Sequence, residues 1–441
     1  MHSSNILIKG ELECSSFFCK SPSVLLYFLS GMQEINVYAY ITPIALLFIA
    51  LEIFFCWYYK KDYITFSEAV ANFGTQLGNQ ATNVLVMVGV FYAYGYLWEN
   101  FRIFTIPINW WSSIVLLLSV DFVFYWIHRW GHEINIMWAA HSPHHSAEEM
   151  NFFVALRASV TQRLASFMFF WVLTIVGFHP VHLYTLVGIH LFIAFLHHTE
   201  LIPKLWRPIE FLFTTPSHHR VHHGVNPQYL DKNFGEFLII WDRIFGTFEE
   251  EQEKIAYGIL DHPKTWNPIY INFHFYIVLW KYAVAAPFWW DKIRIWFMPA
   301  GWIPRGLEKP EKPIITTENQ VKFRPPMLKM SKPYLVLQVI LGILLMIGII
   351  SNVYGWSIGA KWFGAFLLWW QIINWSGILE AKAWLFSSEV LRIPITAFTI
   401  LLLSGAAQAS PFMFGVIAVS LISILWTLWF FRPDSPKLAT S

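Results

Sequence analysis

The stretch DFVFYWIHRWGHEINIMWAAHSPHH, residues 121–145, carries an apolar run directly into a set of histidines. His128 and His132 are four residues apart, so on a helix that continues the apolar run they share one face. The HSPHH motif at the end of the stretch spaces three more histidines at i, i+3 and i+4, again the pattern of one helical face. The stretch therefore predicts two adjoining helical segments that aim their imidazoles at a common point.

A third cluster, HHRVHH at residues 218–223, repeats this spacing, and fourteen of the 17 histidines lie between His128 and His223. Imidazole suits iron, zinc and copper, and one ion takes about four to six donors. The clustered histidines exceed what one ion can use and favour a dinuclear centre. The candidate metal ligands in the three clusters are His128, His132, His141, His144, His145, His218, His219, His222 and His223.

The rest of the chain has the composition of a membrane protein. Of its 441 residues, 56% are hydrophobic and only 13% are charged. Because about 20 apolar residues cross a bilayer as a helix, we expect an all-α integral membrane protein, a multi-span helical bundle with the histidine-rich site at one membrane face. The predicted spans are 37–57, 81–98, 110–127, 164–178, 183–196, 334–350, 361–373, 391–407 and 411–431.

Five regions are expected along the chain. An N-terminal arm (1–36), which lacks the features of a signal peptide, precedes a catalytic membrane domain (37–299). A polar, proline-rich linker (300–333) separates this domain from the C-terminal transmembrane helices (334–431) and a tail (432–441).

Charge and loop length predict the orientation. Lys60 and Lys61 follow the first predicted span, so the positive-inside rule places that end in the cytosol. Two further crossings return the chain to the same face at His128, and the tight connection 177–182 makes a hairpin of the next two spans. All three histidine clusters are therefore expected at the cytosolic face.

Other classes of site are disfavoured. The net charge of only +2, with Lys and Arg dispersed along the chain, argues against a nucleic-acid-binding surface. The three cysteines show no CxxC spacing, which argues against disulfides, iron–sulfur clusters and zinc thiolates. The pair His132-Glu133 begins like the HExxH motif of zinc proteases, but Ile136 stands in place of the second histidine. Histidine therefore has to carry any metal.

Two carboxylates are candidate catalytic residues. Glu133 follows a predicted ligand and could orient an imidazole or accept a proton; a solvated acid at a helix end is the alternative. Asp121 lies seven residues before His128 on the same helical face, inside an apolar span, which favours a supporting role beside the ligands. Glu148 and Glu149 are expected to begin a solvated turn.

The three clusters resemble the histidine boxes of the fatty acid hydroxylase/sterol desaturase superfamily of membrane di-iron enzymes, as HX3H at 128–132 and HX2HH at 141–145 and 219–223. From about residue 98 to 258, the amino-acid sequence is similar to that of the ether-lipid-cleaving branch of this superfamily. The stretches that carry this likeness include WENFRIF, ALR, HTE, TPSHHRVHHG and DKNFGEFLIIWDRIFGTFEEE. His198 in the HTE triplet matches a family histidine, so the resemblance adds it as a further ligand.

This resemblance implies a monooxygenase that uses iron, O2 and tetrahydrobiopterin. Such an enzyme hydroxylates the ether-bearing carbon of an alkylglycerol or a lyso-alkyl phospholipid and releases a fatty aldehyde and a glycerol derivative. The implied location is the endoplasmic reticulum membrane. The pterin rests on the resemblance alone, and no residue is assigned to it.

Two alternatives stay open. A sterol or fatty-acyl desaturase or hydroxylase fed by cytochrome b5 would carry the same histidine boxes. A histidine-rich metal transporter would place its ligands near the bilayer midplane on broken helices, whereas these histidines lie at the predicted helix ends.

Overall fold

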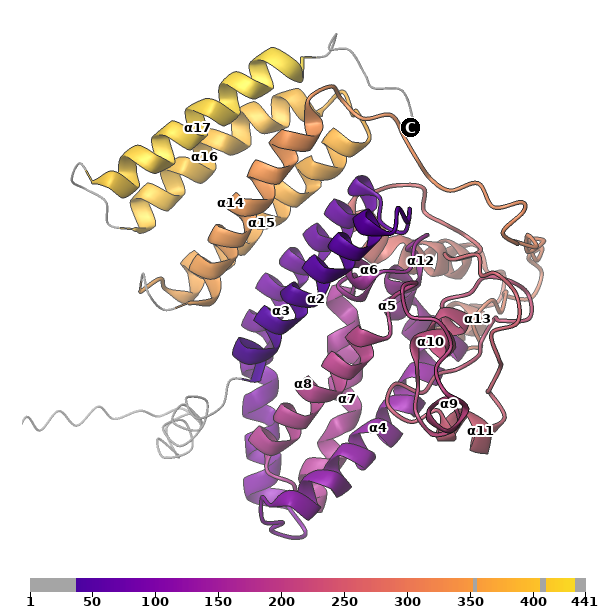
Figure 1. The fold of residues 1–441 in the computed structure, drawn as a ribbon. Coiled ribbons are helices and arrows are strands. Elements are labelled where there is room, and N and C mark those ends of the chain that lie inside the picture. Colours follow the sequence, from indigo (N-terminus) through magenta and orange to yellow (C-terminus); the bar gives the residue numbers. More distant parts are fainter. Residues whose placement is uncertain (1–36, 352–354, 405–409, 433–441) are drawn as a thin grey trace, which may run out of the picture.

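The computed structural model describes residues 37–351, 355–404 and 410–432, and these are mostly α-helical (Figure 1). The predicted arm 1–36 and nearly all of the tail 432–441 lie outside the described residues. Within the described part, six helices are long and apolar enough to cross a membrane, which confirms the predicted multi-span helical architecture. They are α2 (Val37–Tyr58), α3 (Phe66–Phe101), α4 (Trp110–Glu133), α14 (Ser331–Ile350), α16 (Leu385–Leu403) and α17 (Pro411–Phe430).

The other three predicted spans are helices that fall outside this set. α7 (Val160–Val176) and α8 (Pro180–Leu196) have 17 residues each and form the predicted hairpin around Gly177. α15 (Ile358–Leu379) has 22 residues and is not among the six spans. These helices complete the two bundles visible in Figure 1 and give the membrane spans their packing partners.

α3 begins 15 residues before the predicted span and connects the two bundles. Its first half packs Leu77 and Ala81 against α14 and α15, and its second half packs Tyr94 against α7 and α8. A Cβ at Gly78 would lie 2.7 Å from the Trp369 ring of α15, so glycine permits this close approach of helices. The sequence pattern missed the early start because Asn72 and neighbouring polar residues interrupt the apolar run.

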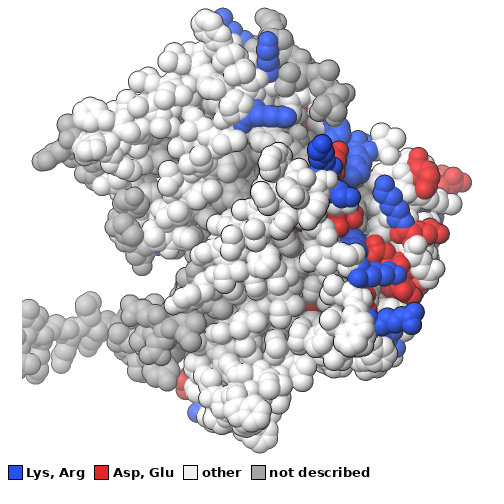
Figure 2. Space-filling model, in the orientation of Figure 1, with Lys and Arg blue, Asp and Glu red and all other residues white. Residues whose placement is uncertain are grey.

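A layer of short helices and loops covers one end of the spans. It contains α5 (Asn135–His145), α6 (Phe152–Ala155), α9 (Arg207–Leu212), α10 (Pro216–His222), α11 (Ile240–Phe245), α12 (Pro268–Ala285) and α13 (Trp289–Arg294). Figure 2 shows that charged side chains gather over this layer, at the right of the view, while the adjoining helical surface is almost free of them. The layer is thus the polar end of a largely apolar molecule.

Candidate metal centre

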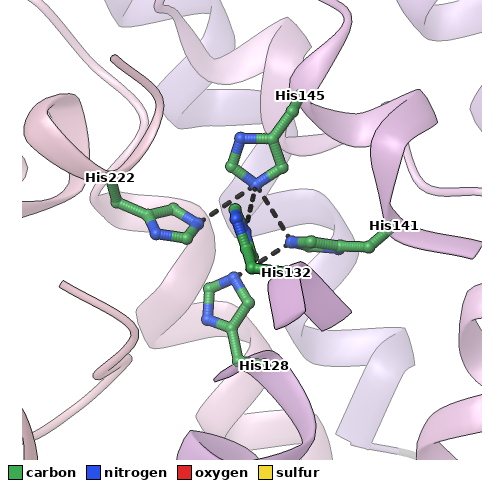
Figure 3. A group of neighbouring side chains, drawn as sticks. All are labelled: His128, His132, His141, His145 and His222. Atoms are coloured by element: carbon green, nitrogen blue, oxygen red, sulfur yellow. Dashed lines mark hydrogen bonds between the residues drawn. The ribbon is translucent and has the colours of Figure 1, made fainter. Parts of the chain in front are cut away.

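Nine of the ten predicted ligand histidines come together in two buried groups. In each group, one ring nitrogen from every member lies within 4.8 Å of the others. The first group (Figure 3) consists of His128, His132, His141, His145 and His222. The second group consists of His144, His198, His219 and His223. The predicted convergence of the three sequence clusters is therefore observed.

A sharp corner between α4 and α5 brings the first two clusters together. α4 ends at Glu133, Ile134 is extended, and α5 starts at Asn135. The Asn135 backbone N–H donates to the Met298 carbonyl (3.0 Å), and its side-chain amide donates to the Ile295 carbonyl (2.8 Å). The corner folds α5 back against α4, so the histidine-bearing faces of both helices meet.

The Nε2 atoms of the first group lie at the separations expected around one ion. The His128–His141, His132–His145 and His145–His222 Nε2 pairs are each 3.1 Å apart, and the His141–His145 pair is 3.0 Å apart (Figure 3). Nitrogen ligands about 2.1 Å from a metal ion sit roughly 3 Å from one another. The geometry is that of a coordination shell.

Backbone carbonyls determine which ring nitrogen carries the proton. His128 Nδ1 lies 2.9 Å from the Phe234 carbonyl, and His222 Nδ1 lies 3.0 Å from the Lys232 carbonyl. A carbonyl only accepts, so Nδ1 is the donor and Nε2 presents a lone pair. Lone pairs this close repel one another unless a cation lies between them. The first group is therefore arranged as a cation site.

The second group repeats this arrangement with four histidines. His198 Nε2 lies 3.2 Å from His144 Nε2 and 3.0 Å from His219 Nε2, and His223 Nε2 lies 3.2 Å from His219 Nε2. His198 Nδ1 donates to the Ala194 carbonyl (3.0 Å), which turns its Nε2 inward. His198, which the resemblance suggested, is an integral member of this group.

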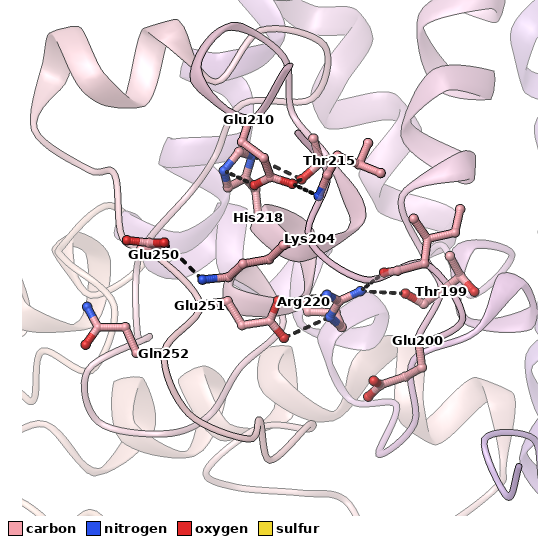
Figure 4. Close-up of polar contacts among 12 residues, drawn as sticks. Thr199, Glu200, Lys204, Glu210, Thr215, His218, Arg220, Glu250, Glu251 and Gln252 are labelled. Carbon is pink, nitrogen blue, oxygen red and sulfur yellow. Dashed lines mark hydrogen bonds and ion pairs between the residues drawn. The ribbon is translucent and has the colours of Figure 1, made fainter. Parts of the chain in front are cut away.

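Arg220 attaches the loop after α8 to α10 and so aligns the second group (Figure 4). Its guanidinium donates to the Thr199 carbonyl (3.1 Å) and pairs with Glu251 (2.7 Å). Thr199 follows His198 directly, and Arg220 follows His219 directly. One side chain thereby holds the two backbone segments whose histidines face each other.

Gln162 at the start of α7 contacts His141 from outside the first group. Nε2 of the Gln162 amide lies 3.0 Å from Nδ1 of His141. Oε1 of the same amide is buried without a hydrogen-bond partner in the described residues. Turning the amide by 180° lets Oε1 accept from Nδ1–H, satisfies that oxygen and leaves His141 Nε2 free to bind metal. Gln162 is thus positioned to orient a ligand.

Burial favours the neutral form of seven imidazoles in the two groups. It lowers the pKa of His144 to about 4. Burial first, and neighbouring imidazoles second, lower the pKa well below its usual value at His141, His145, His198, His219, His222 and His223. Neutral imidazole is the form that binds metal, so the site is ready for a cation near neutral pH.

Asp121 lies two helical turns from the first group and supports it through a loop. Its buried carboxylate accepts hydrogen bonds from His190 Nε2 (2.8 Å), the Phe237 N–H (3.0 Å) and Trp241 Nε1 (2.8 Å). The same loop supplies the Phe234 carbonyl that orients His128. These contacts place Asp121 where it could position the loop, and the supporting role expected of it stays a prediction.

Glu236 is a buried carboxyl beside both groups that the sequence analysis missed. Its Oε1 lies 3.4 Å from His128 Nδ1, and its carboxyl shares a further 4.8 Å cluster with His197 and His219. Burial first, then Asp121, raises the pKa of Glu236 well above its usual value. The available signal was a single acid inside the apolar run FGEFLIIW.

Glu133 does not reach the histidines. Its Oε1 accepts from Arg129 Nε at 2.8 Å, and its side chain is 42% exposed. The corner at Ile134 turns α5 and its ligands away from this side of α4. The structure therefore matches the alternative interpretation, a solvated acid at a helix end.

His218 also lies outside both groups. Its Nε2 is 3.0 Å from Glu210, and its Nδ1 is 3.4 Å from the Thr215 hydroxyl (Figure 4). Successive residues of a helix point about 100° apart, so His218 and the adjacent ligand His219 face different directions. The structure places His218 in a hydrogen-bonded brace beside the centre.

The expectation of a solvated turn at Glu148 and Glu149 was wrong. Both are buried; Glu148 accepts from the Phe323 N–H (2.6 Å), and Glu149 pairs with Arg324 (2.9 Å). The linker returns over this turn and covers it, a long-range contact with no local sequence signal. The linker is irregular but anchored here.

The described chain combines six candidate membrane spans with two histidine groups that could hold metal, and the sequence comparisons show which proteins it resembles. Residues 113–247 match the fatty acid hydroxylase family, and this segment contains every histidine of both groups. The resemblance inferred from the histidine boxes is confirmed. No solved structure was found to match the chain.

The similar curated proteins carry a more particular name. The chain is 42% identical over 254 residues to the alkylglycerol monooxygenase of Homo sapiens, covering 56% of each chain. It is 35% identical over 299 residues to that of Xenopus tropicalis, covering 66% of this chain and 64% of the relative. A very-long-chain aldehyde decarbonylase of Arabidopsis thaliana is 27% identical over 164 residues, covering 33% of this chain and 26% of that protein. The chain thus spans less than two thirds of the length of these relatives.

Proposed function

We propose that this chain is an iron- and O2-dependent monooxygenase of ether lipids that uses tetrahydrobiopterin. The observation that carries the proposal is the pair of buried histidine groups within the segment similar to alkylglycerol monooxygenases. One oxygen atom of O2 would be inserted at the ether-bearing carbon, and the other would be reduced to water with two electrons from the pterin. The resulting hemiacetal would break into a fatty aldehyde and a glycerol derivative.

The donor set fits two iron ions, one held by each group. Five and four imidazoles, without a thiolate, are donors that iron accepts. Bound iron would supply the redox chemistry that activates O2. The two groups are linked through neighbouring residues, since His144 belongs to the second group and His145 to the first. The comparisons assign no residue to the pterin, which remains part of the proposal through the resemblance.

The surrounding residues have defined tasks in this proposal. The Phe234 and Lys232 carbonyls, with Gln162, orient ligands of the first group. Burial raises the pKa of the Glu236 carboxyl well above its usual value, and this carboxyl is placed to give or take a proton beside both groups. The burial of the histidines keeps bulk water from the reacting centre.

The location of the site suits a lipid substrate. The histidines lie at the end of the candidate span α4 and on α5 and α10 of the polar layer, so an alkyl chain in the bilayer and a head group in water could reach the site together. We propose that this polar layer faces the cytosol and that the membrane is the endoplasmic reticulum, as Lys60, Lys61 and the resemblance suggest.

The decisive experiment compares two substrate pairs on the purified protein reconstituted with iron. An alkylglycerol with tetrahydrobiopterin should yield fatty aldehyde in an O2-dependent reaction. Turnover only of a sterol or fatty-acyl substrate, with NADH and cytochrome b5, would instead support the desaturase or hydroxylase alternative. Zinc as the sole bound metal, with no O2-dependent turnover after iron reconstitution, would favour a metal transporter.

A further inference from the structure

The C-terminal helices contain a long cavity, far in sequence from the histidine groups. The cavity has a volume of about 400 Å³ and lies between α14, α16 and α17. Its lining extends along α14 from Gln338 to Gly348 and along α16 from Arg392 to the C-cap residue Ser404. At 1.5 Å per helical residue these stretches give a length of about 15–18 Å. The cavity is therefore long and narrow.

The walls of this cavity are apolar over most of its length. Leu341, Leu345, Ile400, Val416 and Val419 are among the residues that line it. A volume of about 400 Å³ spread over this length gives a mean cross-section of about 25 Å², which accommodates one extended hydrocarbon chain. The shape and the lining favour a single alkyl or acyl chain.

A buried polar network closes one end of the cavity. Arg392 pairs with Glu389 through two hydrogen bonds (3.0 and 2.7 Å) and also donates to Gln338 (3.0 Å). Tyr334 (2.6 Å) and Asn374 (2.9 Å) complete the bonding of the Glu389 carboxylate. Charged residues inside membrane spans are costly and are retained mainly for function.

The charges of this network are balanced, which limits the ligand. The side chains of Arg392 and Glu389 are 4% and 0% exposed, and they form a one-to-one ion pair. An anionic or cationic head group would add an uncompensated charge within an apolar bundle. The head group that fits beside the pair is neutral and polar, such as a hydroxyl or a carbonyl.

Thr396 offers this head group an unused hydrogen-bonding atom. It lies one helical turn beyond Arg392 and lines the cavity. Its Oγ1 is buried without a hydrogen-bond partner in the described residues. Because an unsatisfied buried hydroxyl is unfavourable, this atom indicates a polar partner inside the cavity.

The polar end of the cavity lies toward the membrane face that carries the histidine centre. Lys332, at the start of α14, sits 5.8 Å from the ring centroid of Phe66, at the start of α3. Just before α14, Arg324 pairs with Glu149, four residues after His145. A lipid in the cavity would therefore have its head toward this face and its chain toward the opposite one.

We propose that this cavity binds a neutral, single-chain lipid whose hydroxyl or carbonyl head group contacts Thr396 and the Arg392–Gln338 end. This site is separate from the histidine centre and does not depend on the proposed monooxygenase activity. Its lining residues all lie between 338 and 423, outside the fatty acid hydroxylase segment.

Photo-crosslinking of the full chain in phosphatidylcholine nanodiscs tests this proposal. The probe is a monoacylglycerol with a diazirine in its chain, whose ester linkage separates binding from ether cleavage. We expect label on the cavity faces of α14, α16 and α17, displaced by unlabelled monoacylglycerol at lower concentration than by a fatty acid or a sterol. Evenly spread, non-displaceable label would mean bulk bilayer lipid only and would overturn the proposal, as would stronger displacement by a fatty acid or a sterol.

Two variants locate the site. Gly415 lines the cavity, and a Cβ there meets nothing within 4 Å, so Gly415→Leu should fill the space and reduce displaceable label at least tenfold. Gly89→Leu in α3, also open at Cβ but outside the cavity, is the matched control and should label normally. Thr396→Val keeps the shape, removes the hydroxyl and should weaken binding about 3–10-fold. Wild-type displacement curves for both Thr396→Val and a folded Gly415→Leu would refute the site; if Gly415→Leu does not fold, Thr396→Val decides alone.

Discussion

Oε1 of Glu236 lies 3.4 Å from Nδ1 of His128, and the same carboxyl clusters within 4.8 Å with His219 of the second histidine group. One buried acid therefore adjoins both groups. The Asp121 carboxylate accepts a hydrogen bond from the N–H of Phe237, the residue after Glu236. The loop that carries Phe237 therefore sets the position of Glu236.

Glu236→Gln should reduce turnover about 100-fold or more because it removes a buried proton donor and acceptor next to the ligands. Metal content should stay near wild type, since the histidines remain. Product formation and metal analysis on the same preparation check this. Glu133→Gln is the matched control: its carboxylate pairs with Arg129, so we expect near-wild-type rates. A large loss in Glu133→Gln would return that residue to the catalytic set.

His222→Ala should remove metal from the first group and abolish turnover, because Nε2 of His222 faces His145 at 3.1 Å. His218→Ala, on the same short helix, should retain both metal and activity, because His218 contacts Glu210 instead. Metal per chain, measured by mass spectrometry, distinguishes the two. Equal metal loss in both variants would contradict this assignment.

Asp121→Asn should lower metal affinity about 10–100-fold without any direct contact to metal. The amide cannot accept from His190, Phe237 and Trp241 as the carboxylate does, so the loop that orients His128 loosens. Metal dissociation followed with a chelator measures the effect. An Asp121→Asn protein that is folded and holds metal at wild-type affinity would exclude the positioning role.

Substitutions at Gln162 test whether its side-chain oxygen orients the ligand His141. Gln162→Leu removes the acceptor for His141 Nδ1–H and should weaken metal binding about tenfold. Gln162→Glu keeps an acceptor oxygen and should retain most of the affinity. The opposite order of the two variants would show that the amide donates to His141 and that our orientation of it is incorrect.

Glu149 predicts a pH dependence of stability. Burial first, then Glu68, raises the pKa of Glu149 from 4.5 to about 7 in the folded protein. The folded state thus binds this proton more tightly than the unfolded state, so the contribution to stability is present below about pH 4.5 and is lost as the pH rises through 7. The unfolding temperature of wild type should fall as the pH rises from 5 to 8. In Glu149→Gln, whose side chain cannot ionise, this fall should be smaller. Identical pH profiles would refute this coupling.

Much of this protein could be predicted from short-range patterns. The apolar runs identified the membrane helices, and the spacing of His128 with His132, and of His141 with His145, placed each pair on one helical face. Helical periodicity is a local property, set by 3.6 residues per turn, and so it can be read from the order of residues.

Only the tertiary structure decided how these faces combine. His144 joins the second group while His141 and His145 join the first, because the helix turns His144 toward His198 at the end of α8. Glu236 enters the site, and Glu149 becomes buried, through segments that return from far along the chain. Such contacts depend on how the helices pack and on which distant segments the loops bring together. The spacing of residues along the chain predicts neither.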